Sequence, residues 1–551
     1  MIYYRGIIRY LKGSILLIFF ACFWGSAYCQ VNEPQSTAVY GYLYRMAQKG
    51  RIDWNDYLLP LDRKDILEAL KELDAEKDLL TKTERSELGF YLKEYAFDLP
   101  QSLLTERNSI LKKDSAGRFR SAQFIKGDAK IFIDPLIGLQ YMGVTGDRQM
   151  TRLFSGIRLA GYFGKRWGFN FSFRDITEKG DTITRSQSFS PGEGFVPTSE
   201  SKRLANYSTL NFNIGYRWRD GALTIGKENL SFGYGQHGNM ILSGKAPSFP
   251  FIKFDYKPWS WLHFNYFHGW LHSNLIDSGR SYNTGTGFLN GRREVYRDKF
   301  LANHSITLTP FKGLDVSIGE SVVYSNKLNI AYFIPVNFFK IYDHQLSRYN
   351  LQAGDNSQFF GFVSSRNHIK NTHLYAQLFI DEIRISRVFD KIQKRNQLGY
   401  TIGVSRTDNF INYLTAGIEY SRINPFVYAN LIPSQTYESH SFTLGDWMGN
   451  NADRVYLYLQ YVPLPKLRMK LWHQKIRKGA AGTLQQQYFQ QPQPKFLFAK
   501  VFDYKEAAFS ASYEWINRLM LFGEWNKVKV NYVNGPATTN SSIKLGFTYG
   551  L

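Results

Sequence analysis

Alternation of apolar and polar residues limits the fold of this chain more than any other feature. From about Arg120 onward, apolar side chains occupy every second position in segment after segment, with Asn, Ser, Arg, Lys and Gly between them. Successive side chains of a β-strand point to opposite faces, so this period predicts strands with one apolar and one polar face. Clear examples are residues 169–174, 211–219, 414–421, 467–472 and 542–551.

Two folds offer such strands a suitable environment, a soluble sandwich and a membrane barrel. Three features favour the barrel: an export signal, the absence of cysteine after that signal, and Trp, Tyr and Phe near strand ends, where membrane interfaces place them. The chain also ends on an alternating strand at Leu551. Closing first strand on last would leave no unpaired edge.

The first 29 residues have the pattern of a secretory signal peptide. Arg5, Arg9 and Lys12 precede a short apolar run over residues 15–24, and small residues follow before a cleavage site near Cys29. The run is shorter than the ~20 apolar residues that a spanning helix needs. Both cysteines lie in this segment, so we expect a mature chain with no disulfide and no thiolate metal site.

Residues 30–115 are predicted to form a small periplasmic helical module. Tyr40, Leu43 and Ala47 fall at helical spacing. A second helix follows Asp62, with Ile66, Leu70 and Leu73 on its apolar face, and a third begins at a Thr81–Glu84 capping box and buries Leu88, Tyr91, Leu92 and Tyr95. Because the other helix faces are charged, we expect this module to be exposed to water.

The predicted fold class is therefore an all-β transmembrane antiparallel β-barrel of about 16–18 strands over residues 116–551, preceded by the helical module. Long polar insertions at residues 178–202, 273–291 and 474–493 are predicted to be extracellular loops.

Charge is distributed unevenly between these parts. The segment 31–110 holds 11 basic and 15 acidic residues, whereas the whole chain is +22. The basic excess therefore belongs to the barrel. A basic surface suits anionic partners such as acidic polysaccharide or lipopolysaccharide phosphates, and it equally suits simple solubility and lipid-headgroup contact.

Three motifs suggest chemistry that their context does not support. Residues 233–238 match G-x-G-x-x-G but open no helix, so no dinucleotide site is expected. On one strand His263 and His268 face opposite ways, and His268 and His272 lie about 13 Å apart, too far to share a metal ion. Residues 438–440 are adjacent and cannot form a triad. We expect no enzyme activity, no cofactor, no metal and no nucleic acid.

Two groups of residues are candidates for function. Sugar binding needs planar hydrogen-bonding groups beside aromatic faces, and acidic sugars add a need for cations. One predicted loop offers this combination in Asn274, Arg280, Tyr282, Asn283, Asn290 and Arg292, although it also resembles an ordinary solvated loop. A second set is predicted to pair with lumen Arg and Lys as a polar network: Glu228, Glu320, Asp381, Glu382, His440 and Asp453.

Several segments in order along the chain resemble the Wzi-like capsule-assembly proteins. They are residues 226–235 (GKENLSFGYG), 241–250 (ILSGKAPSFP), 319–324 with 332–335, 375–382, and 437–440 leading into 445–453. The resemblance implies an outer-membrane barrel of about 18 strands behind a periplasmic helical part. It also implies lectin-like association with surface polysaccharide during capsule assembly, without catalysis.

The leading functional hypothesis is thus a non-enzymatic barrel that binds capsular polysaccharide and aids its assembly or attachment. The expected partners are outer-membrane lipid and lipopolysaccharide, acidic surface polysaccharide, and the outer-membrane assembly machinery that reads a terminal strand. A porin or solute transporter of the outer membrane is the alternative, and a structural or secretion-accessory barrel or a barrel enzyme is a further one. The residues do not identify the glycan.

Overall fold

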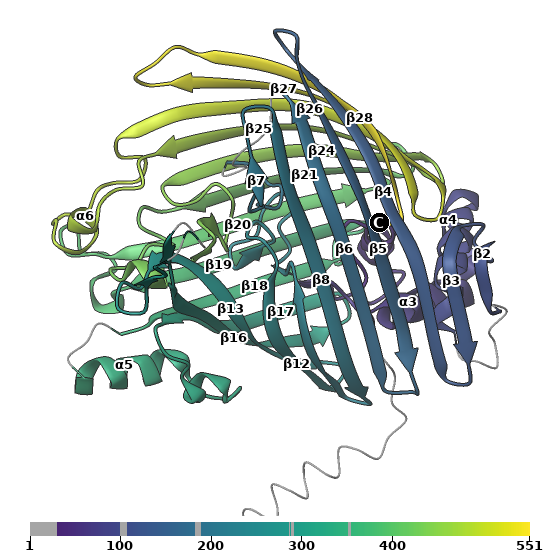
Figure 1. The fold of residues 1–551 in the computed structure, drawn as a ribbon, viewed down its shortest axis with the longest axis horizontal. Coiled ribbons are helices and arrows are strands. Elements are labelled where there is room, and N and C mark those ends of the chain that lie inside the picture. Colours follow the sequence, from purple (N-terminus) through teal and green to yellow (C-terminus); the bar gives the residue numbers. More distant parts are fainter. Residues whose placement is uncertain (1–29, 100–106, 182–188, 286, 288–290, 351–353) are drawn as a thin grey trace, which may run out of the picture.

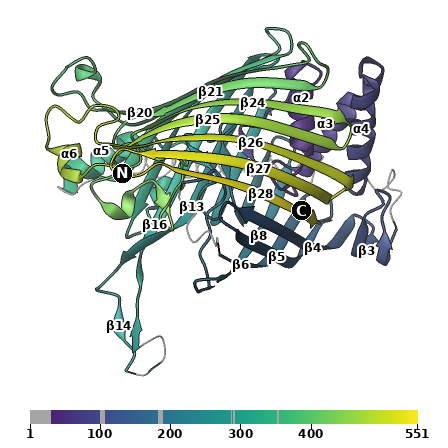
Figure 2. The ribbon, with the colours of Figure 1, turned by 90° about the horizontal axis from the view of Figure 1, so that it is seen from above.

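A closed antiparallel β-barrel forms most of the molecule in the computed structural model, which describes residues 30–99, 107–181, 189–285, 287, 291–350 and 354–551 (Figures 1 and 2). Within these ranges eighteen strands make up its wall. They are β4 (Ala129–Val144), β5 (Arg148–Phe163), β6 (Trp167–Gly180), β8 (Leu204–Trp218), β9 (Gly221–Glu228), β12 (Phe249–Trp259), β13 (Leu262–Ile276), β16 (Tyr296–Phe311), β17 (Leu314–Ser325), β18 (Asn356–Arg366), β19 (Thr372–Ile383), β20 (Asn396–Thr407), β21 (Leu414–Ile423), β24 (Ala452–Leu464), β25 (Leu467–Gly479), β26 (Lys500–Ile516), β27 (Leu519–Tyr532) and β28 (Thr538–Tyr549).

The barrel closes between its first and last strands, as the alternation at the end of the chain predicted. β28 pairs with β4 from Ser542 opposite Val144 to Tyr549 opposite Ile137. The first residues of β4 extend beyond β28 and pair with β3 (Phe119–Lys126), which pairs with β2 (Ser109–Lys113). This additional hairpin therefore begins before residue 116.

The two ends of the barrel differ in the length of their connections. Turns such as 164–166, 219–220 and 517–518 join strands at one end, whereas segments such as 229–248, 326–355 and 424–451 join them at the other. Short turns mark the periplasmic end of such barrels and long loops the extracellular end. The predicted loops 178–202, 273–291 and 474–493 each begin a few residues too early, because β6 continues to Gly180, β13 to Ile276 and β25 to Gly479.

Outward-facing positions carry an apolar belt. Leu139, Ile318, Leu471, Trp525 and Leu545 alternate with inward-facing neighbours and expose much of their surface. An apolar surface of this extent would favour aggregation in water, so the belt marks the part of the wall that contacts lipid. No helix in the described ranges combines the length and apolarity needed to cross a bilayer.

The three N-terminal helices lie together at the short-turn end of the barrel (Figure 2). α2 (Val39–Gln48), α3 (Arg63–Ala75) and α4 (Lys82–Glu94) enclose their own core, which includes Leu43, Ile66 and Leu88. The predicted capping box is confirmed, with Thr81 and Glu84 satisfying each other's backbone N–H groups at the start of α4. The 3-10 helices η1 (Lys77–Leu79) and η2 (Ala96–Asp98) follow α3 and α4.

Smaller elements lie in the long connections or link them to the module. These are β1 (Leu58–Leu59), β7 (Ser199–Glu200), β10 (Ser231–Phe232), β11 (Leu242–Ser243), β14 (Tyr282–Asn283), β15 (Arg292–Arg293), η5 (Ile330–Phe333), α5 (Phe339–Asn350), η6 (Ile385–Arg387), η7 (Pro433–Gln435), β22 (Glu438–Ser439), β23 (Phe442–Thr443) and α6 (Leu484–Tyr488). The predicted signal peptide, residues 1–29, lies outside the described residues.

Candidate functional site

The barrel lumen is filled by chain segments from both ends. From the periplasmic end, β1 of the module pairs with β10, and β10 pairs with β11, inside the barrel. From the extracellular end, segments 229–248 and 424–451 fold inward and pack Phe232, Ile241 and Trp447 against the inner wall. The largest buried apolar cluster of the described residues therefore lies inside the barrel rather than outside it.

An ion-pair network fixes these inward loops to the wall. The guanidinium group of Arg454 on β24 lies 3.0 Å from Asp446 in segment 424–451 and 3.3 Å from Glu419 on β21. Glu419 also accepts a hydrogen bond from the backbone N–H of Gln236 at 2.7 Å and one from Tyr375 at 2.9 Å. Both inward loops are thus held by one set of buried charges.

The G-x-G-x-x-G motif has a packing role in this plug. A Cβ atom on Gly238 would lie 2.4 Å from a carboxylate oxygen of Asp446, and one on Gly235 would lie 1.9 Å from the carbonyl oxygen of Gly238. These glycines allow the backbone to pass close to the charged anchor.

The helical module is docked on the barrel rather than freely exposed, which corrects the expectation of a water-exposed module. Barrel arginines around the periplasmic rim reach its acidic side chains. Arg217 lies 2.9 Å from Asp62, Arg366 contacts Asp56, and Arg518 contacts both Glu33 and Glu94. The acidic balance of the module and part of the basic excess of the barrel are therefore complementary surfaces of one interface.

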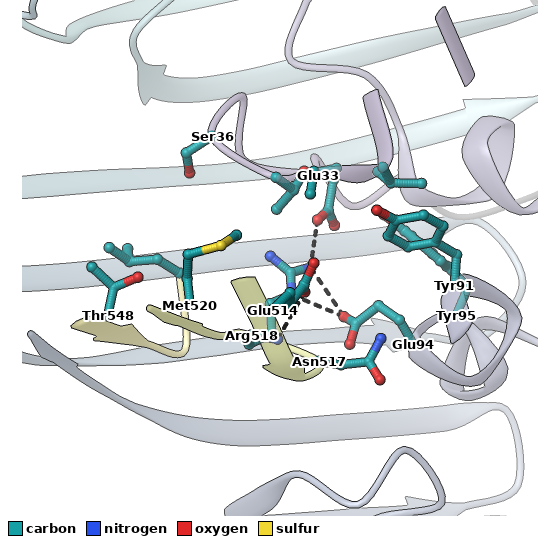
Figure 3. A pocket seen from close by; sticks show the side chains of 14 residues that line it. Glu33, Ser36, Tyr91, Glu94, Tyr95, Glu514, Asn517, Arg518, Met520 and Thr548 are labelled. Atoms are coloured by element: carbon teal, nitrogen blue, oxygen red, sulfur yellow. Dashed lines mark hydrogen bonds and ion pairs between the residues drawn. The ribbon is translucent and has the colours of Figure 1, made fainter. Parts of the chain in front are cut away.

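A cavity of about 170 Å³ lies at this interface, between the module and the β26–β27 turn. Figure 3 shows Arg518 reaching Glu33 and Glu94, with Tyr95 and Met520 on the cavity wall. Burial raises the pKa of Glu94, but the surrounding arginines, Arg118 and Arg518 foremost, outweigh it and hold this pKa well below its usual value. Glu94 is therefore a buried carboxylate that stays charged.

At the extracellular end, polar and aromatic side chains form a cluster on the rim of the barrel, here named the β13 rim. The turn between β22 and β23 docks on the upper end of β13, where His440 donates its backbone N–H to the carbonyl oxygen of His272 at 3.2 Å. The two imidazole rings stack with centroids 4.2 Å apart, Tyr296 packs beside them, and Asn274 donates to Ser441. Burial lowers the pKa of His440 to about 4, so its ring is neutral at pH 7.

The predicted sugar-binding residues fall on this rim and on the hairpin beside it. Arg280 lies 2.8 Å from Asp277 and 3.1 Å from Asp298, at the base of the β14–β15 hairpin. Tyr282 and Asn283 on β14 pair with Arg293 and Arg292 on β15, and all four are exposed. The hairpin projects away from the barrel (Figure 2). Asn290 lies outside the described residues.

The predicted lumen network divides into two groups. Glu228 is inside the barrel and accepts hydrogen bonds from Asn32 and Asn213, both at 2.7 Å, and Asp381 accepts the backbone N–H of Tyr428 at 2.7 Å. Glu382 is half-buried and lies 3.1 Å from Arg395 in an extracellular loop.

The lumen prediction is wrong for Glu320 and Asp453, and also for His440, whose stacking partner His272 has the strand parity of the outer-face His268. Glu320 has the same strand parity as the exposed Ile318, and Asp453 that of the exposed Val455, so both lie on the outer face. Glu320 accepts the backbone N–H of Phe339 at 2.7 Å at the start of α5, and Asp453 pairs with Arg477. Each is buried by an extracellular segment or an outer-face partner, which the sequence pattern did not reveal.

The histidine prediction is consistent with the register. His263 lies inside the barrel beside Tyr57. His268 lies on the outer face, where it shares a hydrogen bond of 2.8 Å with the hydroxyl group of Tyr324. No group of three or more potential metal ligands occurs in the described ranges.

Sequence reasoning missed the charged anchor of the plug. Asp446 lies within a family-like segment, and the alternation around Val455 predicts an inward Arg454. Glu419 sits among polar inward-facing positions of β21 in the same way. The inward positions of Arg454 and Glu419 were therefore predictable, but no local pattern indicates that segment 424–451 folds into the barrel.

The fold defines a class of protein, a plugged eighteen-strand barrel of the outer-membrane type with an N-terminal helical module docked at its short-turn end. The family model of the capsule assembly protein Wzi matches residues 155–521, so the chain belongs to the Wzi capsule assembly family. No curated protein matches the chain.

Solved structures support the fold. The chain is similar to Wzi of Escherichia coli, described as an outer-membrane protein involved in group 1 capsule assembly and a carbohydrate-binding β-barrel. The TM-score is 0.56 at 10% identity, over 96% of this chain and 100% of that one. Weaker likenesses are to Pseudomonas aeruginosa OpdK with vanillate (TM-score 0.42, 11% identity, 77% of this chain and 98% of that one) and OccK3 (0.41, 12%, 77% and 95%).

Proposed function

We propose that this chain is a non-catalytic outer-membrane barrel that binds capsular polysaccharide at its extracellular rim and aids capsule assembly or attachment. The observation that carries the proposal is the combination of a lumen filled from both ends with a polar, aromatic rim in a member of the Wzi family. A filled interior leaves no open path for a freely diffusing solute, so the proposal places ligand binding on the extracellular surface.

The β13 rim and the β14–β15 hairpin supply the groups that an acidic glycan needs. Tyr282 and Tyr296 offer ring faces, Asn274 and Asn283 offer amides, and Arg292 offers a cation. Arg280 is held in place by two aspartates, so its free N–H groups are positioned before a ligand arrives.

Binding of the purified full chain to capsular polysaccharide from its own host tests this directly. We expect Arg292→Ala/Tyr282→Ala to weaken binding by about tenfold or more, since each charged hydrogen bond and stacked ring is worth roughly 1–3 kcal/mol. Lys112→Ala/Lys113→Ala, on the exposed periplasmic β2, is the matched control and should bind normally. Equal loss in both variants would remove the rim from the proposal.

The porin alternative makes a different prediction. A solute channel should give steady conductance in planar bilayers, whereas the filled lumen predicts none. In cells, normal capsule retention after deletion of the gene would contradict the proposed function. The non-catalytic role predicts that the polysaccharide keeps its length and that no fatty acid is released from lipid during incubation with the protein.

Insertion of the barrel is proposed to depend on its last strand. β28 presents Ile543, Leu545 and Phe547 to the outer face and ends two residues before Leu551. This alternating terminus has the form that the outer-membrane assembly machinery reads. Polar substitution of these three residues should leave the exported chain in the periplasm.

A further inference from the structure

Three neighbouring lysines form a row on the outer face of the barrel. Lys475 on β25 is directly opposite Lys505 on β26, and Lys505 is directly opposite Lys529 on β27. All three side chains are exposed. Residues opposite each other on adjacent strands have Cβ atoms about 5 Å apart, a separation at which like charges repel.

Ion pairs balance the charges in the next row but not in this one. Two residues closer to the extracellular end, Arg477 lies between Asp453 and Asp503 in register, with its Nε atom 2.9 Å from Asp453. Asp503 also pairs with Lys500 at 2.7 Å. Across the described ranges, none of the three row lysines makes a hydrogen bond or ion pair within the chain. Their charge is therefore available to an external anion.

The row lies at the upper edge of the apolar belt. Four residues below it on the same three strands are Leu471, Phe509 and Trp525, all exposed and apolar. From the start of β25 to Lys475 is eight residues, or about 26 Å of strand, which a tilt of about 40° reduces to roughly 20 Å of height. An apolar band about 25 Å tall would therefore end near these lysines, on the outer-leaflet side.

An open, mostly apolar groove begins beneath Lys475 and Lys505 and extends sideways across the outer face, away from Lys529 on β27. It encloses about 620 Å³ on the outer face between β20 and β26. Its outward-facing lining includes Ala416, Leu457, Leu471 and Ala507, and Ala507 lies two residues below Lys505 on β26. The small alanine side chains create the depression between larger neighbours.

We propose that this surface is a binding site for a phosphorylated glycolipid of the outer leaflet, with the lysine row holding phosphate groups and the groove holding an acyl chain. Charge and apolar contact are stacked in the order in which such a lipid presents them. A soluble acidic polysaccharide would meet the lysines but would leave the groove empty. The site is separate from the β13 rim, so the lipid proposal does not depend on the proposed glycan binding.

The test compares lipids with and without phosphate. The full chain is reconstituted with vesicles containing lipid A or dephosphorylated lipid A, and bound lipid is counted by mass spectrometry after mild extraction. We expect Lys475→Gln/Lys505→Gln/Lys529→Gln to bind about tenfold less lipid A than the unaltered chain, and both to retain little dephosphorylated lipid. Lys112→Gln/Lys113→Gln/Lys126→Gln, which removes three exposed charges at the periplasmic end, is the control.

Two further variants separate folding from recognition. Replacing the three row lysines by arginine preserves the charge and should preserve binding, and Ala507→Phe fills the groove and should weaken lipid A binding with the lysines intact. Equal lipid A binding by the glutamine variant and the unaltered chain would overturn the proposal. So would equal binding of both lipids, or loss of polysaccharide binding in place of lipid binding.

Discussion

The guanidinium group of Arg518, in the turn between β26 and β27, lies 3.0 Å from the carboxylate of Glu94 at the end of α4. These residues are 424 positions apart, and both are buried. The contact joins the last hairpin of the barrel to the module that precedes the first strand. It also involves Glu33, which Arg63 reaches from the other side at 2.7 Å.

Removing Arg518 should loosen the module without opening the barrel. Arg518→Ala leaves Glu33 and Glu94 buried with fewer cations, and breaking a buried pair in this way costs about 3–5 kcal/mol. We expect the module to become sensitive to protease while the barrel stays resistant to unfolding in detergent. Limited proteolysis followed by mass spectrometry measures both.

The matched control is Arg219→Ala, which removes an exposed arginine from another periplasmic turn. Its ion pair with Asp220 is open to solvent, so no measurable change is expected. Unchanged protease resistance in Arg518→Ala would show that the apolar contacts of the module are sufficient to hold it.

Docking of the module should also weaken in acid. The pKa of Glu94 is held well below its usual value in the folded state. A carboxyl group of this kind stabilises the fold fully above its unfolded pKa of about 4.3, and the contribution is lost as the pH falls through the lower, folded value. Thermal unfolding followed from pH 7 to pH 3 should show this loss.

Glu94→Gln supplies the comparison for the acid experiment. This variant should already be less stable at pH 7, because it no longer offers a negative charge to Arg118 and Arg518. The difference from the unaltered chain should shrink as the pH falls below about 4. A constant difference over the whole range would mean that other carboxylates dominate the acid response.

The wall of the barrel was predictable because the alternation within each strand indicates which of its side chains face outward. Leu467, Met469 and Leu471 alternate with polar residues, and this period alone assigns outer and inner faces. Local helix signals were equally direct, as the Thr81–Glu84 capping box shows. Both kinds of signal depend on residues that are close together in the sequence.

The plug and the rim depend on long-range contacts that leave no such period. Segments 229–248 and 424–451 show neither a strand period nor a helix period, yet both fold into the lumen, where Phe232 and Tyr234 of the first segment meet Tyr57 of the module. Glu320 differs from these segments, because its shared parity with Ile318 already indicates the outer face, and only its burial depends on α5 folding back over the outer wall. The plug residues owe their position to contacts with segments far along the chain.

Loss of the charged anchor should open the plug. Arg454→Ala leaves Asp446 and Glu419 buried in the lumen without their cation. We expect segment 424–451 to detach for part of the time, because the cost of an unpaired buried charge is about 3–5 kcal/mol. We expect this variant to show intermittent conductance in planar bilayers, and the unaltered chain to show none.

Arg477→Ala is the control for the conductance measurement. It removes an arginine from the same region of the wall, but from the outer face, where Arg477 pairs with Asp453. This variant should give no conductance in planar bilayers. Conductance in Arg477→Ala equal to that in Arg454→Ala would point to general loosening of the barrel instead of release of the plug.

α5 and the residues before it should lie in the membrane interface. The segment packs Tyr332 and Phe339 against the outer wall, and Tyr332 donates a hydrogen bond to Asp355 at 2.7 Å. Its opposite side exposes Ile330, Val336, Phe338 and Ile341, by between 59% and 76%. So much exposed apolar surface beside the lipid belt is typical of a segment resting on the headgroup and acyl boundary.

A single fluorophore can report this position, because both cysteines of the chain lie within the predicted signal peptide. Phe338→Cys labelled with an environment-sensitive dye should be quenched by brominated phospholipid in reconstituted vesicles. The same dye at Arg85→Cys, on the exposed side of α4, should not be. The contradicting result would be quenching of both labels by aqueous iodide and of neither by brominated lipid. In that case α5 projects into water, and its apolar side is available to bind another protein.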